Sequence, residues 1–194
     1  MPQKFNLHPP NRHTISTERA KIEIESLPIR IFGKAENSIV DGAGLRYVLF
    51  VQGCPRDCPG CHNPKSHDIN GGEECKTDEL WRDIRDTRRI DGVTFSGGEP
   101  FLWGHELALI GKAARKSKLD VWTYTGYTLE ELLEKAKTEP GTHELLTVTN
   151  ILVDSPFILE KRDLTSPYRG STNQRIWNVT CYPNSKNATL LAGG

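Results

Sequence analysis

Three cysteines lie within eight positions of one segment, Cys54, Cys58 and Cys61, with the spacing C-x3-C-x2-C. Thiolates this close together, in a segment bent by Gly and Pro, can converge on one inorganic centre. A zinc knot completed by His62 or Cys75 is one interpretation, but zinc sites usually combine two separated ligand pairs. We favour an iron–sulfur cluster. A cubane cluster usually takes four cysteines, so three would leave one iron open.

A second candidate segment, Ser96–Pro100 (SGGEP), follows a predicted strand over residues 92–95. Glycines at 97 and 98 would let a ligand approach the backbone, although a tight turn before a helix is the alternative. Thr125 and Asp154 follow two further predicted strands, over residues 119–124 and 151–153. For Asp154 a ligand contact and a helix N-cap are both open.

These segments must be positioned by alternating strands and helices. We predict an edge strand around Pro28, further strands over residues 46–51 and near 175–180, and helices over 78–88, 103–116 and 128–137. Thr77 is the expected N-cap of the first helix, and the sequence TLEE predicts a capping box at Thr128. Pro140-Gly141 should end the third helix, followed by a short helical turn.

The expected fold class is α/β, with a mainly parallel sheet, because strands alternate with helices. The chain of 194 residues is too short for an eight-unit barrel of ~250. We therefore expect an incomplete TIM-type barrel of about five to six βα units over residues 27–194, after a loosely ordered extension over 1–26. The candidate residues would share the edge where parallel strands end.

Composition narrows the classes of partner. Lys and Arg total 25, as do Asp and Glu, so the formal net charge is zero, which argues against nucleic-acid and anionic-membrane binding. The apolar runs have strand length, and the first residues do not resemble a signal peptide. A cytoplasmic protein is expected. Cys75 and Cys181 are isolated thiols that we expect to be small buried side chains rather than ligands.

The cysteine motif and Gly-Gly-Glu-Pro, each after a strand, resemble the radical S-adenosylmethionine superfamily. Four further segments resemble the anaerobic ribonucleoside-triphosphate reductase activating proteins, a resemblance that spans about residues 29–178: SIVDG (38–42), CHNP (61–64), VDSPF (153–157) and RGSTNQR (169–175). Two positions depart from the pattern. Many superfamily members have an aromatic residue where this chain has Gly60, and the family usually has Asp where it has Asn178.

The resemblance implies that Cys54, Cys58 and Cys61 hold three irons of a [4Fe–4S] cluster, whose fourth iron binds the amino and carboxylate groups of S-adenosylmethionine. It implies cofactor contacts or orienting roles for Gly60, His62, Ser96, Gly97, Gly98, Glu99, Thr125 and Asp154. No side-chain acid or base is required. An electron from a flavodoxin-like or other low-potential reductant would cleave S-adenosylmethionine. The resulting 5′-deoxyadenosyl radical would abstract hydrogen from a glycine on the large subunit of anaerobic ribonucleoside-triphosphate reductase.

Two residues of the last motif, Asn173 and Arg175, are candidates for docking that partner, although an internal ion pair of Arg175 is an equal alternative. Other functions remain open: another small radical enzyme, such as a pyruvate formate-lyase activator or a deazapurine synthase, or a non-enzymatic iron–sulfur or zinc module. The Asn-Gln-Arg segment disfavours the other enzymes. The Gly-Gly-Glu-Pro segment disfavours the module, because a structural metal knot needs no second ligand-binding loop.

Overall fold

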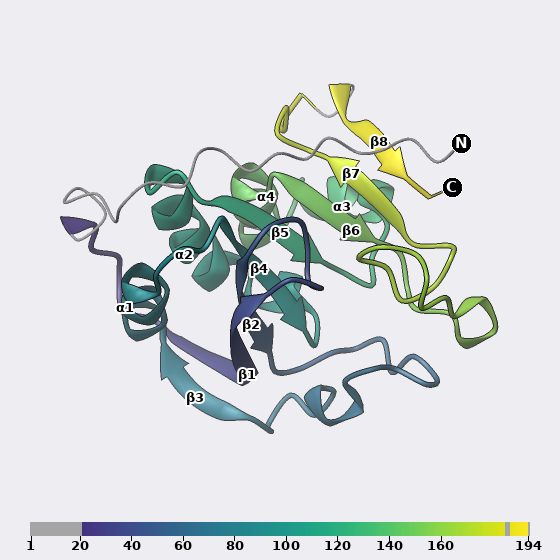
Figure 1. Cartoon of the computed structure of the whole chain (residues 1–194), viewed down its shortest axis with the longest axis horizontal. Coiled ribbons are helices and arrows are strands. Elements are labelled where there is room, and N and C mark those ends of the chain that lie inside the picture. Colours follow the sequence, from purple (N-terminus) through teal and green to yellow (C-terminus); the bar gives the residue numbers. More distant parts are fainter. Residues whose placement is uncertain (1–20, 185–186, 194) are drawn as a thin grey trace.

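The computed structural model of the chain describes residues 21–184 and 187–193. Its eight strands form one sheet in the order β3-β1-β2-β4-β5-β6-β7-β8 (Figure 1). The strands are β1 (Pro28–Ser38), β2 (Arg46–Val51), β3 (Glu73–Lys76), β4 (Gly92–Gly97), β5 (Asp120–Tyr124), β6 (Ile151–Asp154), β7 (Arg175–Asn178) and β8 (Thr189–Ala192). The α-helices are α1 (Thr77–Asp86), α2 (Gly104–Lys116), α3 (Leu129–Lys135) and α4 (Pro140–Val148), with 3-10 turns at Pro64–Ser66, Pro100–Trp103 and Leu159–Lys161.

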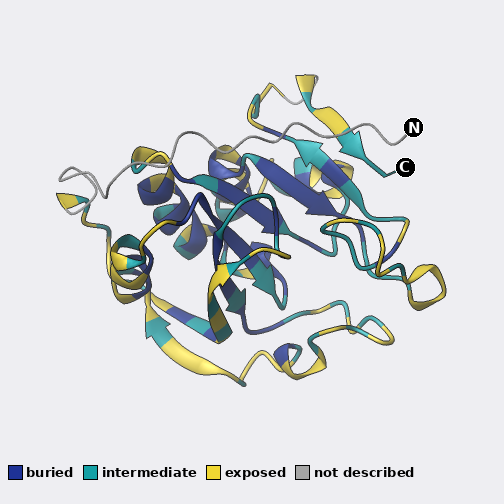
Figure 2. Ribbon diagram, in the orientation of Figure 1, coloured by how far each residue is buried: buried dark blue, intermediate teal, exposed yellow. Residues whose placement is uncertain are grey.

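The helices pack against one face of the sheet. The main core joins alternate residues of the central strands, such as Val93 and Val121, to Trp81 of α1, Ile110 of α2 and Leu145 of α4. Figure 2 shows the central strands buried and β3 exposed. The alternate residues on the opposite face form a smaller cluster around Trp122, Ile151, Val153 and Ile176. Successive strand side chains point to opposite faces, and among the described residues no α-helix contributes to this second cluster.

The α/β class is confirmed, but the expectation of a mainly parallel sheet is wrong. Parallel pairing is confined to β2–β4, β4–β5 and β5–β6. β1 and β3 extend one side of this centre, and β7 and β8 the other, by antiparallel pairing. Antiparallel neighbours need only short connections, so these strands add to the sheet without helices. The incomplete barrel of five to six βα units is not confirmed.

The first described residues lie along α1. Trp81 Nε1 donates to Ile22 O at 2.8 Å, and Thr77 Oγ1 donates to Glu25 O while it accepts from Leu27 N at 2.9 Å. Thr77 is therefore not the N-cap of α1, because its hydroxyl is engaged by this segment. Residues 1–20 of the expected extension lie outside the described residues. The boundary at residue 27 stays a prediction.

Two helical expectations have opposite outcomes. The capping box at Thr128 is confirmed, since its side chain accepts from Glu131 N and the Glu131 side chain accepts from Thr128 N. The expected helical turn after residue 140 is wrong: Pro140 begins the nine-residue helix α4. Proline suits the first turn of a helix, where its missing N–H would have had no partner.

Candidate cofactor site

A cavity of about 770 Å³ lies on the face of the sheet away from the helices. It is bordered by the segments that follow β2, β4, β5 and β6. Eight of the predicted site residues line it: Cys54, Cys58, Cys61, His62, Ser96, Gly97, Gly98 and Thr125. The structure therefore brings together three segments that are far apart in the sequence. Gly60, Glu99, Asp154, Asn173 and Arg175 lie outside this lining.

The cysteine loop, residues 53–63, is folded back at its base. Gly53 N donates to Ser66 O at 2.8 Å and Cys54 N donates to His67 O at 3.1 Å. The buried Gln52 side chain donates through Nε2 to two carbonyl groups, Lys65 O at 3.1 Å and Asp68 O at 2.6 Å. Gln52 thus holds the loop closed directly after β2. This role was missed from the sequence, because its partners lie 13 and 16 residues away.

The three thiols of the loop are free and partly buried. Burial raises the pKa of the Cys54 and Cys58 thiols, and backbone hydrogen bonds from Arg56 and Phe157 respectively oppose that shift. Asn63 N donates to Cys61 Sγ at 3.4 Å. Metal binding would displace the thiol protons, and hydrogen bonds to the sulfurs tune the potential of a cluster.

The donor set fits a cluster with three cysteine ligands. Cys75 is on β3 and packs against the main core, and Cys181 is in the turn after β7; neither lines the cavity. Within the described residues no three His, Cys, Asp or Glu side chains are grouped to hold a single metal ion. In a cubane cluster, by contrast, each cysteine binds a different iron.

Gly97 and Gly98 bring the end of β4 against the base of the cysteine loop. Gly97 has a φ of +97°, and a Cβ there would lie 2.6 Å from Val51 N. A Cβ at Gly98 would lie 2.2 Å from Gly53 O. Glycine is required at both positions by contacts within the chain, in addition to any contact with a ligand. These contacts place the two candidate segments side by side.

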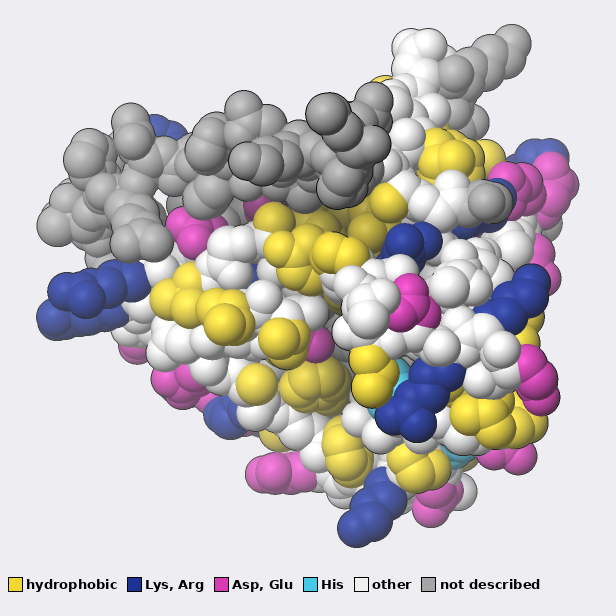
Figure 3. All heavy atoms as spheres, turned by 45° about the vertical axis from the view of Figure 1, so that its right-hand side comes forward, with side chains coloured by type: hydrophobic (Ala, Val, Ile, Leu, Met, Phe, Trp, Pro, Cys, Tyr) yellow, Lys and Arg dark blue, Asp and Glu magenta, His cyan; other side chains and the backbone are white. Residues whose placement is uncertain are grey.

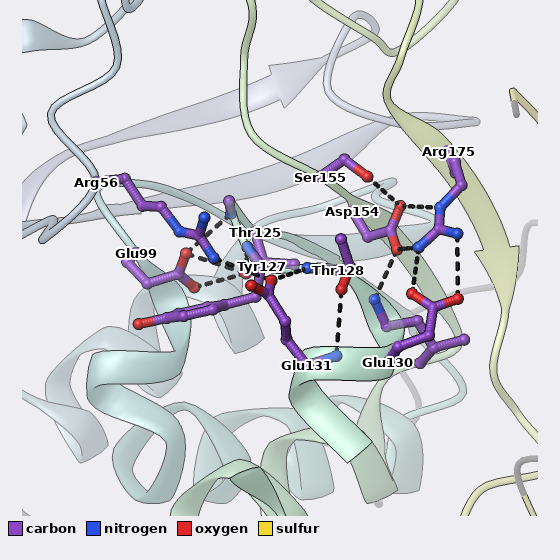
Figure 4. A network of polar contacts seen from close by, with 12 residues as sticks. Arg56, Glu99, Thr125, Tyr127, Thr128, Glu130, Glu131, Asp154, Ser155 and Arg175 are labelled. Atoms are coloured by element: carbon purple, nitrogen blue, oxygen red, sulfur yellow. Dashed lines mark hydrogen bonds and ion pairs between the residues drawn. The ribbon is translucent and has the colours of Figure 1, made fainter. Parts of the chain in front are cut away.

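Glu99 is fully buried, and its carboxylate is occupied by groups of this chain (Figure 4). It accepts from Phe101 N at 3.0 Å, from Gly126 N at 2.9 Å and from the Thr125 hydroxyl at 2.9 and 3.0 Å. The side chain therefore ties the end of β4 to the turn after β5. Glu99 was predicted to contact the cofactor, but it does not line the cavity.

Asp154 is also fully buried, and its carboxylate is occupied by groups of this chain. Its Oδ2 accepts from Leu129 N, the first residue of α3, at 2.7 Å. Arg175 donates to Asp154 through Nε at 3.0 Å and Nη2 at 2.5 Å, and to Glu130 at 3.1 and 2.7 Å (Figure 4). Asp154 thus joins the end of β6 to the start of α3, whose N-cap is Thr128, and it does not line the cavity.

The two predicted docking residues are engaged within the chain. The Arg175 guanidinium joins β7 to β6 and α3 through the contacts above, and its side chain is 20% exposed. Asn173 Nδ2 donates to Pro156 O at 2.9 Å. These contacts match the internal ion pair that was the alternative to docking.

Gly60 and His62 flank the third cysteine of the loop. Gly60 has a φ of +72°, and a Cβ there would lie 2.7 Å from Leu159 Cδ1. This backbone conformation and this contact explain why glycine, not an aromatic residue, precedes Cys61. The His62 ring packs against Phe157 with ring centroids 5.2 Å apart, which fixes its orientation beside the cavity.

Arg56 was missed as a site residue because its partners come from another part of the sheet. It lies between the first two cysteines, lines the cavity, and pairs with Glu131 Oε2 at 3.0 Å. Its guanidinium lies 4.3 Å from the Tyr127 ring centroid. An alternating charge pattern could not reveal this pair, since the two charges are 75 residues apart.

The described residues include no helix long and apolar enough to cross a membrane.

Comparison with known proteins identifies the family. The model of the 4Fe-4S single cluster domain matches residues 40–177. Over 153 residues the chain is 36% identical to the anaerobic ribonucleoside-triphosphate reductase-activating protein of Pasteurella multocida, covering 74% of this chain and 94% of that protein. Identity is 34% to the Escherichia coli K12 protein of that name (73% and 93% covered) and 30% to that of Enterobacteria phage T4 (73% and 88%). The chain therefore belongs to the family of anaerobic ribonucleoside-triphosphate reductase-activating proteins.

Proposed function

We propose that this protein is an activating enzyme that generates a glycyl radical on the large subunit of anaerobic ribonucleoside-triphosphate reductase. Cys54, Cys58 and Cys61 would hold a [4Fe–4S] cluster with one open iron, and S-adenosylmethionine would bind that iron. The observation that carries the proposal is the convergence of three free thiols and the Gly97-Gly98 strand end on one cavity. The names of the relatives agree with this partner.

A cluster held by Cys54, Cys58 and Cys61 would supply, when reduced, the single electron that cleaves S-adenosylmethionine and so allows a hydrogen atom to be taken from the partner's glycine. The protein's own residues bind and orient. The cysteine thiolates hold the metal, and Ser96 and the backbone of Gly97 and Gly98 border the methionine end. Thr125, fixed by Glu99, borders the other side of the cavity. A side-chain acid or base is not needed, because the hydrogen is transferred as an atom.

The mouth of the cavity suits a polypeptide substrate. Ile39 and Val40 on one side and Leu164 on the other line the cavity and are 71%, 71% and 75% exposed. In Figure 3 hydrophobic side chains are interspersed with Lys and Arg over the side of the molecule that this view brings forward. We propose that a glycine-bearing segment of the partner enters here, on the open side of an incomplete barrel, and that a flavodoxin-like or other low-potential protein in the cytoplasm supplies the electron.

Anaerobic reconstitution with iron and sulfide tests the cofactor. We expect about four irons per chain, as in a cubane cluster, and a reduced-cluster EPR signal that changes when S-adenosylmethionine is added. Added reductase should then show a glycyl-radical signal that depends on S-adenosylmethionine. Stoichiometric zinc without sulfide, or an EPR signal that saturating S-adenosylmethionine leaves unchanged, would contradict the open iron.

A further inference from the structure

We propose that Arg56 is a positioning residue that holds the cysteine loop against the turn between β5 and α3, residues 125–128. In the enzyme proposed above, this contact would set the direction in which the open iron faces S-adenosylmethionine. The geometry of the contact does not depend on that function. The consequence of the contact for cofactor binding does depend on that function, so the contact and its consequence are tested separately.

Arg56 makes two contacts with the turn and one with Glu131 in the first turn of α3. Its Nη2 pairs with Glu131 Oε2 at 3.0 Å, and its guanidinium lies 4.3 Å from the Tyr127 ring centroid. Its aliphatic stem passes over Gly126, where a Cβ would lie 3.1 Å from Arg56 Cγ. Arginine can pair with a carboxylate and stack on an aromatic ring at the same time, so one side chain makes both contacts.

The turn that receives Arg56 is itself held by two carboxylates, those of Glu99 and Glu131 (Figure 4). The buried Glu99 carboxylate accepts from Gly126 N and from the Thr125 hydroxyl. Glu131, the partner of Arg56, also accepts from Thr128 N at 2.7 Å in the capping box of α3. A loop attached to this turn is therefore attached to the end of β4 and to α3.

The position of Arg56 in the cysteine loop means that its contact with the turn restrains the cysteines on both sides of it. It is two residues from Cys54 and two from Cys58, so its attachment restrains both ligands together. The backbone N–H of Cys61, the third ligand, donates to Cys58 O at 3.1 Å, so the position of Cys61 depends on that of Cys58. We infer that the three thiols are oriented toward the turn, and toward Thr125 in the cavity, before any cluster is present.

The contact is too exposed to determine whether the chain folds. The side chains of Arg56 and Glu131 are 24% and 49% exposed, and such ion pairs contribute little to stability. Loss of the contact should therefore alter the loop and leave the sheet and helices intact. This separation makes the proposal testable by substitution.

Four variants form the test. Arg56→Gln and Glu131→Gln each remove the ion pair, and glutamine at 131 still completes a capping box. Arg56→Lys keeps the positive charge and should therefore retain part of the wild-type attachment of the loop. Glu134→Gln is the matched control, since Glu134 pairs with Lys137 on the solvent side of the same helix.

The first measurement uses hydrogen–deuterium exchange of the cluster-free protein. We expect the amides of residues 54–61 to exchange several-fold faster in Arg56→Gln and Glu131→Gln than in the wild type and in Glu134→Gln. The second measurement uses the reconstituted protein, titrated with S-adenosylmethionine and followed by the EPR signal of the reduced cluster. Iron content should be unchanged, and half-saturation should need about fivefold more S-adenosylmethionine in Arg56→Gln and less than that in Arg56→Lys.

The outcomes separate the two hypotheses. Unchanged exchange in Arg56→Gln would overturn the attachment of the loop. Faster exchange with unchanged S-adenosylmethionine affinity would overturn the positioning role, as would loss of iron together with a lower melting temperature. A wild-type EPR signal that does not respond to S-adenosylmethionine would refute the proposed function and the positioning toward that ligand, while the exchange result would still report the attachment.

Discussion

At the scale of single residues, Glu99 combines full burial with four hydrogen bonds. Burial raises the pKa of its carboxyl group, and hydrogen bonds from Phe101, Gly126 and Thr125 oppose this, as does the Arg56 charge. The protonated form is therefore more favoured in the folded chain than in the unfolded chain. The contribution of Glu99 to stability is complete below the unfolded pKa of about 4.5 and is lost as the pH rises through the folded pKa.

The substitution Glu99→Gln removes this titration. We expect the free energy of unfolding of the wild type, relative to Glu99→Gln, to fall as the pH rises above about 4.5. Urea unfolding at a series of pH values measures the difference. Glu131→Gln should show the opposite slope, at pH values below about 4.5, because a hydrogen bond from the Thr128 backbone lowers the pKa of Glu131 and its contribution to stability is lost as the pH falls. Parallel curves for wild type and Glu99→Gln would contradict the prediction.

The cysteines provide a second prediction at this scale. Cys54→Ala, Cys58→Ala and Cys61→Ala should each lose the cluster or hold it poorly, whereas Cys75→Ala and Cys181→Ala should retain about four irons per chain. The reason is position: only the first three line the cavity. Iron and sulfide analysis after reconstitution measures how much of the cluster each variant holds. Equal iron loss in Cys75→Ala and Cys58→Ala would mean a site closed by four cysteines.

The sequence predicts the cysteines and glycines of the site better than it predicts the other residues of the site. Three ligands within eight positions are a local pattern, visible without any knowledge of the fold. Arg56 and Glu131 are separated by 75 residues, and their contact depends on how β2 and β5 are placed in the sheet. Glu99 and Asp154 were singled out as candidate cofactor contacts, but both lie outside the lining of the cavity. Their burial, which directs them to partners in this chain, is a property of the folded state.

At the scale of elements, Arg175 joins β7 to β6 and α3. Arg175→Met would leave the fully buried Asp154 without its positive partner, which we expect to lower the free energy of unfolding by about 3 kcal/mol. Glu130→Gln is the control, since its side chain is 64% exposed and its loss should cost only ~0.5 kcal/mol. Chemical denaturation measures both. Unchanged stability in Arg175→Met, with weakened reductase binding, would restore the docking alternative.

Prediction of the elements succeeds where the signal is local. The run RYVLFV and the capping box at Thr128 specify β2 and the start of α3 from a few neighbouring residues. Pro140-Gly141 misleads, because a proline expected to break a helix instead occupies the first turn of α4, after α3 has already ended at Lys135. The edge strands β3 and β8 have four residues each, and β3 pairs with β1, from which β2 and the cysteine loop separate it in the sequence. Their sequences therefore carry too little pattern to indicate them.

At the scale of the whole molecule, the main core and the cysteine loop are separate. The core lies between the sheet and the helices, and the described residues in it include none from the loop, residues 53–63. We expect the protein to keep its secondary structure and a cooperative thermal transition when chelation removes the iron, unlike a zinc finger. Circular dichroism of the cluster-loaded and cluster-free protein provides the measurement. A loss of helical signal on chelation would show that the cluster organises the fold.

A loop that carries all three proposed cysteine ligands, attached to a core to which it contributes no residue, has a consequence for the protein after damage by oxygen. Oxidation that dismantles the cluster would leave a folded chain whose empty loop is still held by Gln52 and Arg56. Such a chain can be refilled with iron and sulfide without being synthesised again. A cell returning to anaerobic conditions would recover activity at the rate of cluster repair, rather than at the slower rate of translation and folding.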